Sequence, residues 1–442
     1  MTSMRTTASV AASAALLARP WRVAAIAVTI AAGALVTACD SNALLDVETP
    51  AAVPVSLIED PANATLMVNS AVADFECALG ATIAVEGLIS DEFADAQLGA
   101  AGWPYDRRDA NTQTNGIYGT NPCTNNQNPG VYTPLSTARW GGDHALGNLT
   151  KWTDADVANR QALIARAALY TGFSYAFLGM AMCEAAFDLG PPVDQQGMFT
   201  LAEARFTQAI TAAQGLGASA AATLNAAYVG RARARLFLGN KTGAATDAAL
   251  VPAGFVLTVE NDATDNRLYN RVYTMTAQNG LYTVEPIARN LTTENGEVDP
   301  RSASTLTATR AADNRAAIWV PNKYAAGYAA PTRVASYTEA RLILAEAQGG
   351  AEAVTIINAL RTAAGLQAYT GATDAASIQN LIIDERRRAL FAEGFRNYDM
   401  QRFNVPFNPA VGAAFPTKGG TYGNTRCLPL PDVERFNNPN IT

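Results

Sequence analysis

Two loop-rich stretches concentrate the side chains that could bind a polar ligand. Residues 100–134 and 252–331 combine aromatic rings with Asn, Asp and Thr and show weak periodicity. Aromatic faces offer apolar contact area to a ligand, while amides and carboxylates bond to its polar groups. We predict that at least one aromatic residue here contacts ligand, the alternative for each being that it only anchors its loop. The candidates are Trp103, Tyr105, Tyr118, Tyr273, Tyr282, Trp319 and Tyr328.

A second set of chemically competent residues lies in the run IDERRRALFAEGFRNYD, residues 383–399. At 100° per residue, Glu385 falls on the same helical stripe as Ile378 and Leu381. A carboxylate on a buried stripe must be paired, and arginines are close in sequence. We therefore favour a structural ion-pair network over an acid–base couple of Glu385 and Glu393. The predicted members are Glu385, Arg386, Arg388, Glu393, Arg396 and Arg402.

The sequence lacks the common residue motifs of enzyme active sites. His144 is the single histidine, and the sequence contains neither a G-x-S-x-G elbow nor zinc-type spacing nor a phosphate-binding P-loop. We expect His144 at a helix start or an interface. The sequence thus predicts no enzyme, no cofactor and no metal site, since EF-hand spacing is absent as well. Glycoside hydrolysis stays a remote alternative, because it depends on the separation of two carboxylates in space.

The N-terminus has the parts of an export signal for a lipoprotein. Three arginines precede the apolar residues 23–36, and Leu35-Val36-Thr37-Ala38-Cys39 has the pattern of a lipobox. We predict that residues 1–38 are removed and that Cys39 is lipidated, with a plain signal peptide or an uncleaved anchor as alternatives. Each buried methylene of an acyl chain contributes ~0.8 kcal/mol to membrane binding. Because Asp40 directly follows Cys39, more than one final membrane leaflet is compatible with this signal.

The net charge of the chain excludes two classes of binding partner. The full chain carries a net charge of −7, and loss of three arginines with residues 1–38 gives 29 − 39 = −10. Such an acidic chain is a poor match for nucleic acid or anionic lipid heads.

After removal of residues 1–38, four cysteines remain: Cys77, Cys123, Cys183 and Cys427. Four cysteines allow three disulfide connectivities. We predict the local pair Cys77 with Cys123, and a buried free thiol is an alternative for Cys183.

The elements that must position these residues are mainly helices. From residue 159 onward, Ala-rich stretches of helical spacing alternate with short Gly, Asn or Pro breaks, as in helix-turn-helix repeats. We predict a mostly α fold in one domain, residues 39–442, with helix-repeat core at about 155–250 and 334–395. Loop-rich segments are expected at about 90–150 and 252–331. The predicted helices are 161–187, 200–214 with a capping box at its start, 224–238, one from 244, 337–348 capped by Ser336, and 352–364.

The late run also resembles the signature of SusD/RagB-type outer-membrane nutrient-binding lipoproteins. Further pieces agree in order along nearly the whole mature chain. They are Cys39 with Leu44-Leu45-Asp46-Val47, Asp299-Pro300-Arg301, Lys323-Tyr324, 339–347, Asn358-Ala359-Leu360-Arg361, Leu428-Pro429-Leu430-Pro431 and Asn438-Pro439-Asn440.

This resemblance implies a scaffold of tetratricopeptide-like helix pairs with long irregular loops over one face. It also implies a lipid-anchored, surface-exposed outer-membrane protein that captures an oligosaccharide or polysaccharide and passes it to a TonB-dependent barrel. It transfers no ligand-binding residue, because those of the family lie in variable loops. The alternative is a lipid-anchored helix-repeat scaffold whose helix faces bind proteins or peptides. The aromatic loops would carry the contacts only in the first case.

Overall fold

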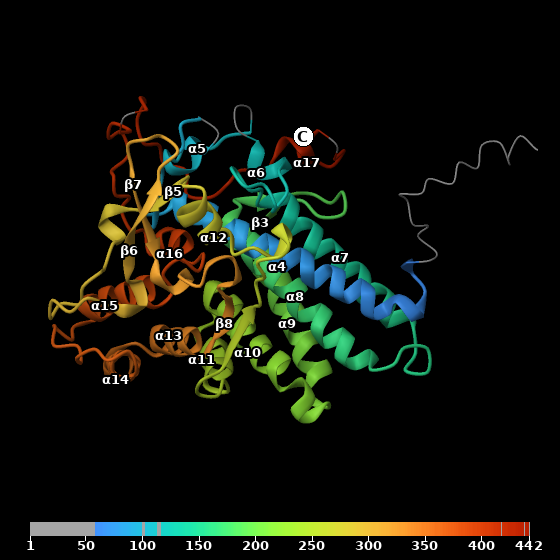
Figure 1. The fold of residues 1–442 in the computed structure, drawn as a ribbon. Coiled ribbons are helices and arrows are strands. Elements are labelled where there is room, and N and C mark those ends of the chain that lie inside the picture. The colour runs from blue at the N-terminus through green and yellow to red at the C-terminus, as the bar shows by residue number, and fades with distance from the viewer. Residues whose placement is uncertain (1–57, 100–101, 113–115, 417, 437, 442) are drawn as a thin grey trace, which may run out of the picture. The chain divides into compact units, whose positions relative to one another are not determined.

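The computed structural model of the chain describes residues 58–99, 102–112, 116–416, 418–436 and 438–441 (Figure 1). The predicted leader and Cys39 with Asp40 lie outside the described residues. Residues 59–442 form one compact unit by themselves. Within the described ranges, no helix has both the length and the apolarity needed to cross a bilayer.

Helices dominate this unit, which confirms the predicted mostly α fold. The longer ones are α4 (Ala64–Ile89), α7 (Tyr132–Lys151), α8 (Arg160–Ala181), α9 (Gln195–Gln214), α10 (Ala221–Phe237), α11 (Lys241–Ala249), α13 (Tyr337–Gln348), α14 (Gly350–Ala363), α15 (Ala375–Ala389) and α16 (Arg396–Arg402). Short helices are α5 (Trp103–Asp106), α6 (Ile117–Thr120), α12 (Arg271–Tyr273) and α17 (Asp432–Arg435).

Close helix packing follows from small residues at the contacts. In Figure 1, α4, α7, α8 and α9 run side by side. A Cβ added at Gly172 of α8 would lie 2.8 Å from the Phe206 ring of α9, and one at Gly179 would lie 2.8 Å from Phe199. Such contacts leave no room for a side chain. The helices are thus held as a packed layer of hairpins, the geometry of tetratricopeptide-like pairs.

The starts of α13 and α9 show whether the helix caps predicted from the sequence are used. Ser336 accepts a hydrogen bond from the Glu339 backbone N–H at 3.2 Å, as the predicted cap of α13 requires. The capping box predicted at Thr200 is wrong. The helix α9 begins five residues earlier at Gln195, where Asp194 accepts from the Gly197 N–H at 2.8 Å. The Thr200 hydroxyl instead donates to the Gln196 carbonyl inside the helix, which a sequence pattern alone does not reveal.

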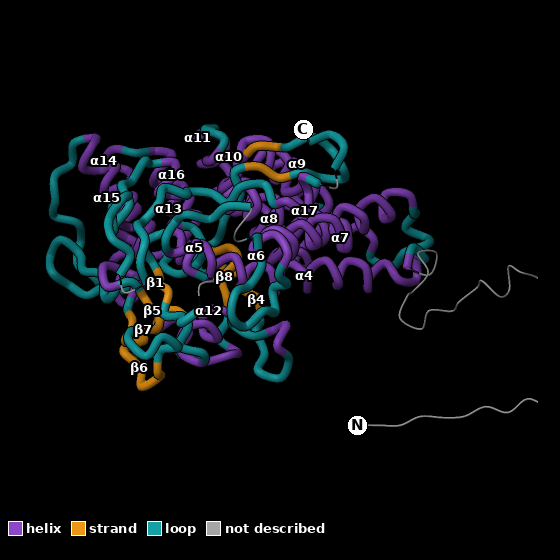
Figure 2. Tube along the Cα trace, turned by 90° about the horizontal axis from the view of Figure 1, so that it is seen from above, coloured by secondary structure: helices purple, strands orange, loops and turns teal. Residues whose placement is uncertain are grey.

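Strands occur as short antiparallel pairs in the segments predicted to be irregular. The pairs are β1 (Phe93–Asp95) with β5 (Tyr282–Val284), β2 (Glu184–Ala185) with β3 (Val193–Asp194), β4 (Val256–Val259) with β8 (Thr332–Ser336), and β6 (Ser304–Arg310) with β7 (Ala317–Pro321). Figure 2 shows β1, β5, β7 and β6 gathered together. The Thr283 hydroxyl joins two of the pairs: it donates to the Ala317 carbonyl and accepts from the Trp319 N–H.

The loop-rich segment predicted at about 90–150 ends earlier than expected, because residues 132–151 form α7. Three glycines weaken the intrinsic helix propensity of this stretch. Tertiary packing outweighs that weakness. Leu135, Leu146 and Leu149 are buried, and a Cβ at Gly142 would lie 2.0 Å from the Thr171 hydroxyl of α8.

Two disulfides tie loops to the helices. The predicted pair of Cys77 with Cys123 is confirmed, with a Cα–Cα distance of 5.7 Å. The alternative of a free thiol at Cys183 is wrong, since it pairs with Cys427 across 244 residues of sequence. The second bond holds the C-terminal segment against the end of α8.

Candidate functional site

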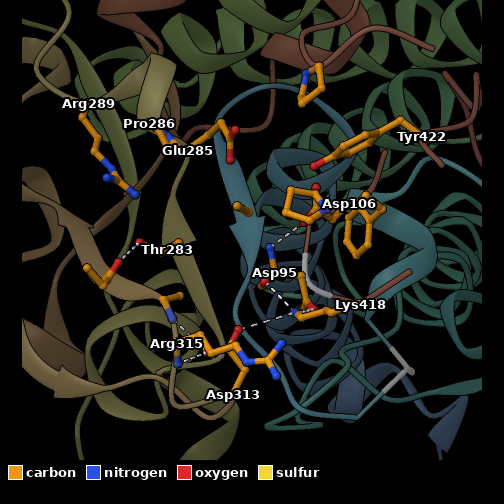
Figure 3. Close-up of a pocket in the computed structure, with 16 residues that line it drawn as sticks. Asp95, Asp106, Thr283, Glu285, Pro286, Arg289, Asp313, Arg315, Lys418 and Tyr422 are labelled. Carbon is orange, nitrogen blue, oxygen red and sulfur yellow. Dashed lines mark hydrogen bonds and ion pairs between the residues drawn. The ribbon is translucent and has the colours of Figure 1, made fainter. Parts of the chain in front are cut away.

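A pocket of about 340 Å³ opens beside the β1–β5 pair and is covered by the C-terminal segment (Figure 3). Glu285 and Arg289 approach the space from one side, while Asp106, Lys418 and Tyr422 approach it from the opposite side. Its size lies at the lower end of the range of small-molecule sites. The lining comes from β1, the 283–289 turn, the 313–317 segment and the stretch 409–422.

Lys418 anchors the covering segment on the floor of the pocket. Its Nζ lies 2.7 Å from Asp95 Oδ2 and donates to the Asp95 carbonyl at 2.8 Å, although the two residues are 323 apart in sequence. Asp106 Oδ2 accepts a hydrogen bond from the Asp95 backbone N–H at 2.8 Å. The floor therefore presents fixed polar groups, which can orient hydroxyl groups.

Burial changes the protonation of the acids in this pocket. It raises the pKa of Asp106 to about 8 and that of Asp95 to about 6, the latter against the attraction of Lys418. The pKa of Glu285 is raised as well, again mainly by burial. Near neutral pH, Asp106 is thus largely a neutral carboxyl that both donates and accepts hydrogen bonds.

Two of the predicted ligand-binding aromatics flank this pocket. The Lys418 Nζ lies 5.6 Å from the centre of the Trp103 ring, and the Arg289 guanidinium lies 5.1 Å from that of Trp319. Both cations line the pocket, and both tryptophans are half-buried. Loops more than 200 residues apart thus place one tryptophan beside each of two cations of the lining, and neither ring is itself part of the lining.

Three other predicted ligand-binding aromatics are buried in the core. Tyr105, Tyr118 and Tyr282 are 0% exposed, so no ring face is free for a ligand. Each belongs to the main hydrophobic core. Their loops are folded inward, and the anchoring alternative applies to all three.

Tyr273 and Tyr328 lie outside the lining of the pocket. They contact each other edge to face at 5.2 Å, and Tyr328 stacks on Tyr269 at 4.1 Å. Tyr269 was not among the candidates, although it shares the loop-rich segment. These half-buried rings form a separate aromatic cluster.

The late charged run is buried and paired, but mostly with partners other than those predicted. Glu385 is 0% exposed, and its oxygens lie 2.6 Å from Arg361 Nε and 2.8 Å from Arg301 Nη2. Arg388 approaches only to 3.9 Å. The expectation that sequence neighbours neutralise Glu385 is therefore wrong in the main, because Arg386 bonds to Asp399 and Arg388 bonds to Asp384 instead.

The remaining members of the network also reach across the fold. Arg386 and Arg402 both bond to Asp399, at 2.8 Å each, and Arg402 also contacts Glu346. Arg396 makes a bidentate pair with Asp91. Glu393 accepts from Lys323 at 2.8 Å and from Arg333 at 3.0 Å.

Four of these partners come from the same short pieces that carried the family resemblance. Arg301 belongs to 299–301, Lys323 to the Lys-Tyr pair and Glu346 to 339–347. Arg361 closes the piece 358–361. Segments scattered along the sequence thus meet around one buried run, which gives a structural reason for their joint occurrence.

The pocket residues were largely missed by sequence reasoning. Asp95, Glu285, Arg289 and Lys418 stand in unremarkable local contexts. Their convergence depends on the β1–β5 pairing and the C-terminal cover. Among the described side chains, no group of three or more His, Cys, Asp or Glu is placed to hold a metal ion.

The raised pKa values give a testable dependence of stability on pH. Burial raises the pKa of Asp106 and of Glu86 to about 8 and that of Glu92 to about 7. Since the folded state then binds these protons more tightly than the unfolded state, their contribution is complete below about pH 4. It is lost as pH rises through 7 to 8. We expect the free energy of unfolding to fall between pH 5 and 9.

Asp106→Asn mimics the protonated acid and should reduce this fall by about 1 kcal/mol or more. Calorimetric unfolding across the pH range measures how far the free energy of unfolding falls in each variant. Asp154→Asn is the matched control, because the Asp154 side chain is 73% exposed. An unchanged slope in Asp106→Asn would contradict the assignment of a raised pKa to Asp106.

The fold and pocket define a helix-repeat protein with an aromatic-flanked polar site, and solved structures share this fold. A SusD-like carbohydrate-binding protein from Bacteroides vulgatus is 15% identical, with a TM-score of 0.65 over 86% of this chain and 97% of that chain. A laminarin-binding SusD-like protein is 16% identical, with a TM-score of 0.62 over 86% and 98%. Surface glycan-binding protein A from Bacteroides uniformis is 16% identical, with a TM-score of 0.54 over 81% and 93%.

The family model described as the SusD family matches residues 256–426, the part that contains the late charged run and most of its partners. No curated protein matches the chain. The match to the SusD family over these residues agrees with the resemblance of the motifs, and the solved SusD-like structures share the fold of the described chain.

Proposed function

We propose that this protein captures a glycan in the pocket between Trp103 and Trp319 and passes it to a TonB-dependent outer-membrane barrel. The observation that carries the proposal is that two half-buried tryptophans, from distant loops, each lie beside a cation that lines one pocket. Stacking faces beside hydrogen-bonding groups are what a sugar ring requires. Structural neighbours whose names state carbohydrate, laminarin or glycan binding add support.

Location and partner rest on the sequence and the family. The lipobox at Cys39 supports an anchored protein, and the SusD family supports exposure at the outer-membrane surface. No metal or cofactor is needed for capture and release. The protein acts by binding rather than by catalysis, with Glu385 and Glu393 held by cations in the interior.

The proposal predicts that Trp319→Ala weakens glycan binding about 5- to 30-fold, since loss of one stacked ring corresponds to roughly 1–2 kcal/mol. Titration calorimetry of the mature protein against a panel of neutral oligosaccharides identifies the ligand and measures this loss. Trp103→Ala should act in the same direction from the opposite wall.

Trp140→Ala is the matched control, because that tryptophan is 53% exposed on α7 and stacks on His144. It should leave glycan affinity unchanged. A glycan bound equally well by both pocket variants would refute this site. Peptide binding without glycan binding would favour the protein-binding scaffold instead.

A further inference from the structure

A second pocket, of about 680 Å³, lies between α15 and the turn 403–406. Tyr369, Asn380 and Asn404 line its walls, and Arg387 and Arg396 lie at its base. Its volume is well within the range of ligand sites. It is distinct from the tryptophan-flanked pocket, because the two share no lining residue.

The two arginines share one carboxylate. Arg396 pairs with both oxygens of Asp91, at 2.7 and 2.8 Å, and Arg387 Nη2 lies 3.3 Å from Asp91 Oδ2. The Asp91 residue is 4% exposed. Two arginines thus share the nearest carboxylate, Arg396 as a buried group and Arg387 as a partly exposed one.

The guanidinium groups also have hydrogen-bonding capacity left over. Within the described part of the chain, Arg387 Nε and Arg396 Nη1 are buried and have no hydrogen-bond partner. These two nitrogens are closed off from the pocket, so a ligand would meet other atoms of the guanidinium groups, for which an anionic oxygen is the best acceptor. The side chains of Arg396 and Arg387 are only 6% and 17% exposed, so both are fixed in place.

Two other acids, Glu294 and Asp384, line the same pocket, and each is paired with an arginine other than Arg387 and Arg396. Glu294, on the wall, binds Arg361 through both oxygens, and Asp384 pairs with Arg388 at 2.9 Å. Glu92 accepts from the Ala392 N–H, and burial raises its pKa to about 7, so it is only partly ionised near neutral pH. Arg387 and Arg396 are therefore the two lining cations whose closest carboxylate, Asp91, lies behind the pocket rather than in its lining.

We propose that this second pocket binds the carboxylate of an acidic sugar, a uronic acid unit, with the sugar ring against Tyr369 and the amides of Asn380 and Asn404. The proposal relies on the proposed function only for the saccharide nature of the ligand. The two pockets have adjoining walls: Arg387 Nη2 donates to the Ile287 carbonyl, and Pro286 and Arg289 line the first pocket. One acidic oligosaccharide can thus occupy both.

The test is titration of the mature protein with D-glucuronate and D-glucose at low salt, together with the neutral glycan that occupies the first pocket. Glucuronate should bind at least tenfold more tightly than glucose. Arg387→Gln should weaken glucuronate binding tenfold or more and leave the neutral glycan unaffected. Trp319→Ala should show the opposite pattern, which separates failure of this proposal from failure of the proposed function.

Arg310→Gln, at an exposed arginine of β6, is the matched control and should change neither ligand. Asn404→Ala, at an exposed wall residue, serves as a second variant if Arg387→Gln does not fold, and should weaken glucuronate several-fold. Equal affinity for glucuronate and glucose, or an unchanged affinity in folded Arg387→Gln and Asn404→Ala, would overturn the site. Inorganic sulfate that competes as well as glucuronate would overturn its assignment to a sugar.

Discussion

Glu385→Gln is expected to lower the free energy of unfolding by about 3–5 kcal/mol, because it leaves buried arginine charges without their partner. Glu385 is 0% exposed and binds Arg361 and Arg301 with separate oxygens. An amide keeps the volume but supplies neither the charge nor a second acceptor. Denaturant unfolding at constant m-value measures the loss.

Asp384→Asn provides the comparison in the same helix. Its side chain is 52% exposed and pairs with Arg388 at 2.9 Å. A surface pair of this kind contributes about 0–1 kcal/mol. Equal destabilisation by both variants would mean that the buried network is not what holds the late run in place.

Removal of the Cys183–Cys427 disulfide, by replacing both cysteines with Ser, should lower the free energy of unfolding by about 4–5 kcal/mol. The bond spans 244 residues, so its loss frees a long loop in the unfolded chain. It also releases the segment that carries Lys418 and Tyr422 over the pocket. Glycan affinity should therefore fall together with stability.

The Cys77–Cys123 disulfide is the internal control, since it spans only 46 residues. Its removal should cost roughly 1 kcal/mol less in unfolding free energy, and it should spare the pocket cover. Thermal unfolding of both double-Ser variants, with glycan titration at a temperature where both are folded, compares the two. A larger loss from the shorter loop would contradict the chain-entropy explanation.

Long helices with clear periodicity were predictable from the sequence. The stretch 337–348 has a serine cap and an apolar stripe, and α13 has the same bounds. The helix α7 was not predictable, because its glycines and threonine lower local propensity and its stability comes from contacts with α4 and α8. The start of α9 was misplaced because Thr200 offers a capping pattern inside a helix that Asp194 already caps.

The candidate site was only half predictable. Composition singled out the aromatic loops, and two of seven candidates, Trp103 and Trp319, flank the pocket. Tyr105, Tyr118 and Tyr282 are equally aromatic but lie in the core, a difference that only folding of the loops decides. Lys418 and Asp95 form their contact across 323 residues, which no local pattern marks.

The same limit applies to the charged run. Its apolar stripe correctly indicated that Glu385 is buried and needs a cation. The cations are Arg301 and Arg361 because the neighbouring Arg386 and Arg388 bond to Asp399 and Asp384 instead.

The most direct measurement is a mild-detergent pull-down of the tagged, lipidated protein from its native membranes, with mass spectrometry of the co-purifying proteins. A TonB-dependent barrel in stoichiometric amount is the result that glycan capture for import predicts. A reproducible set of other envelope proteins, with no such barrel, would contradict this function and favour an anchored protein-binding scaffold.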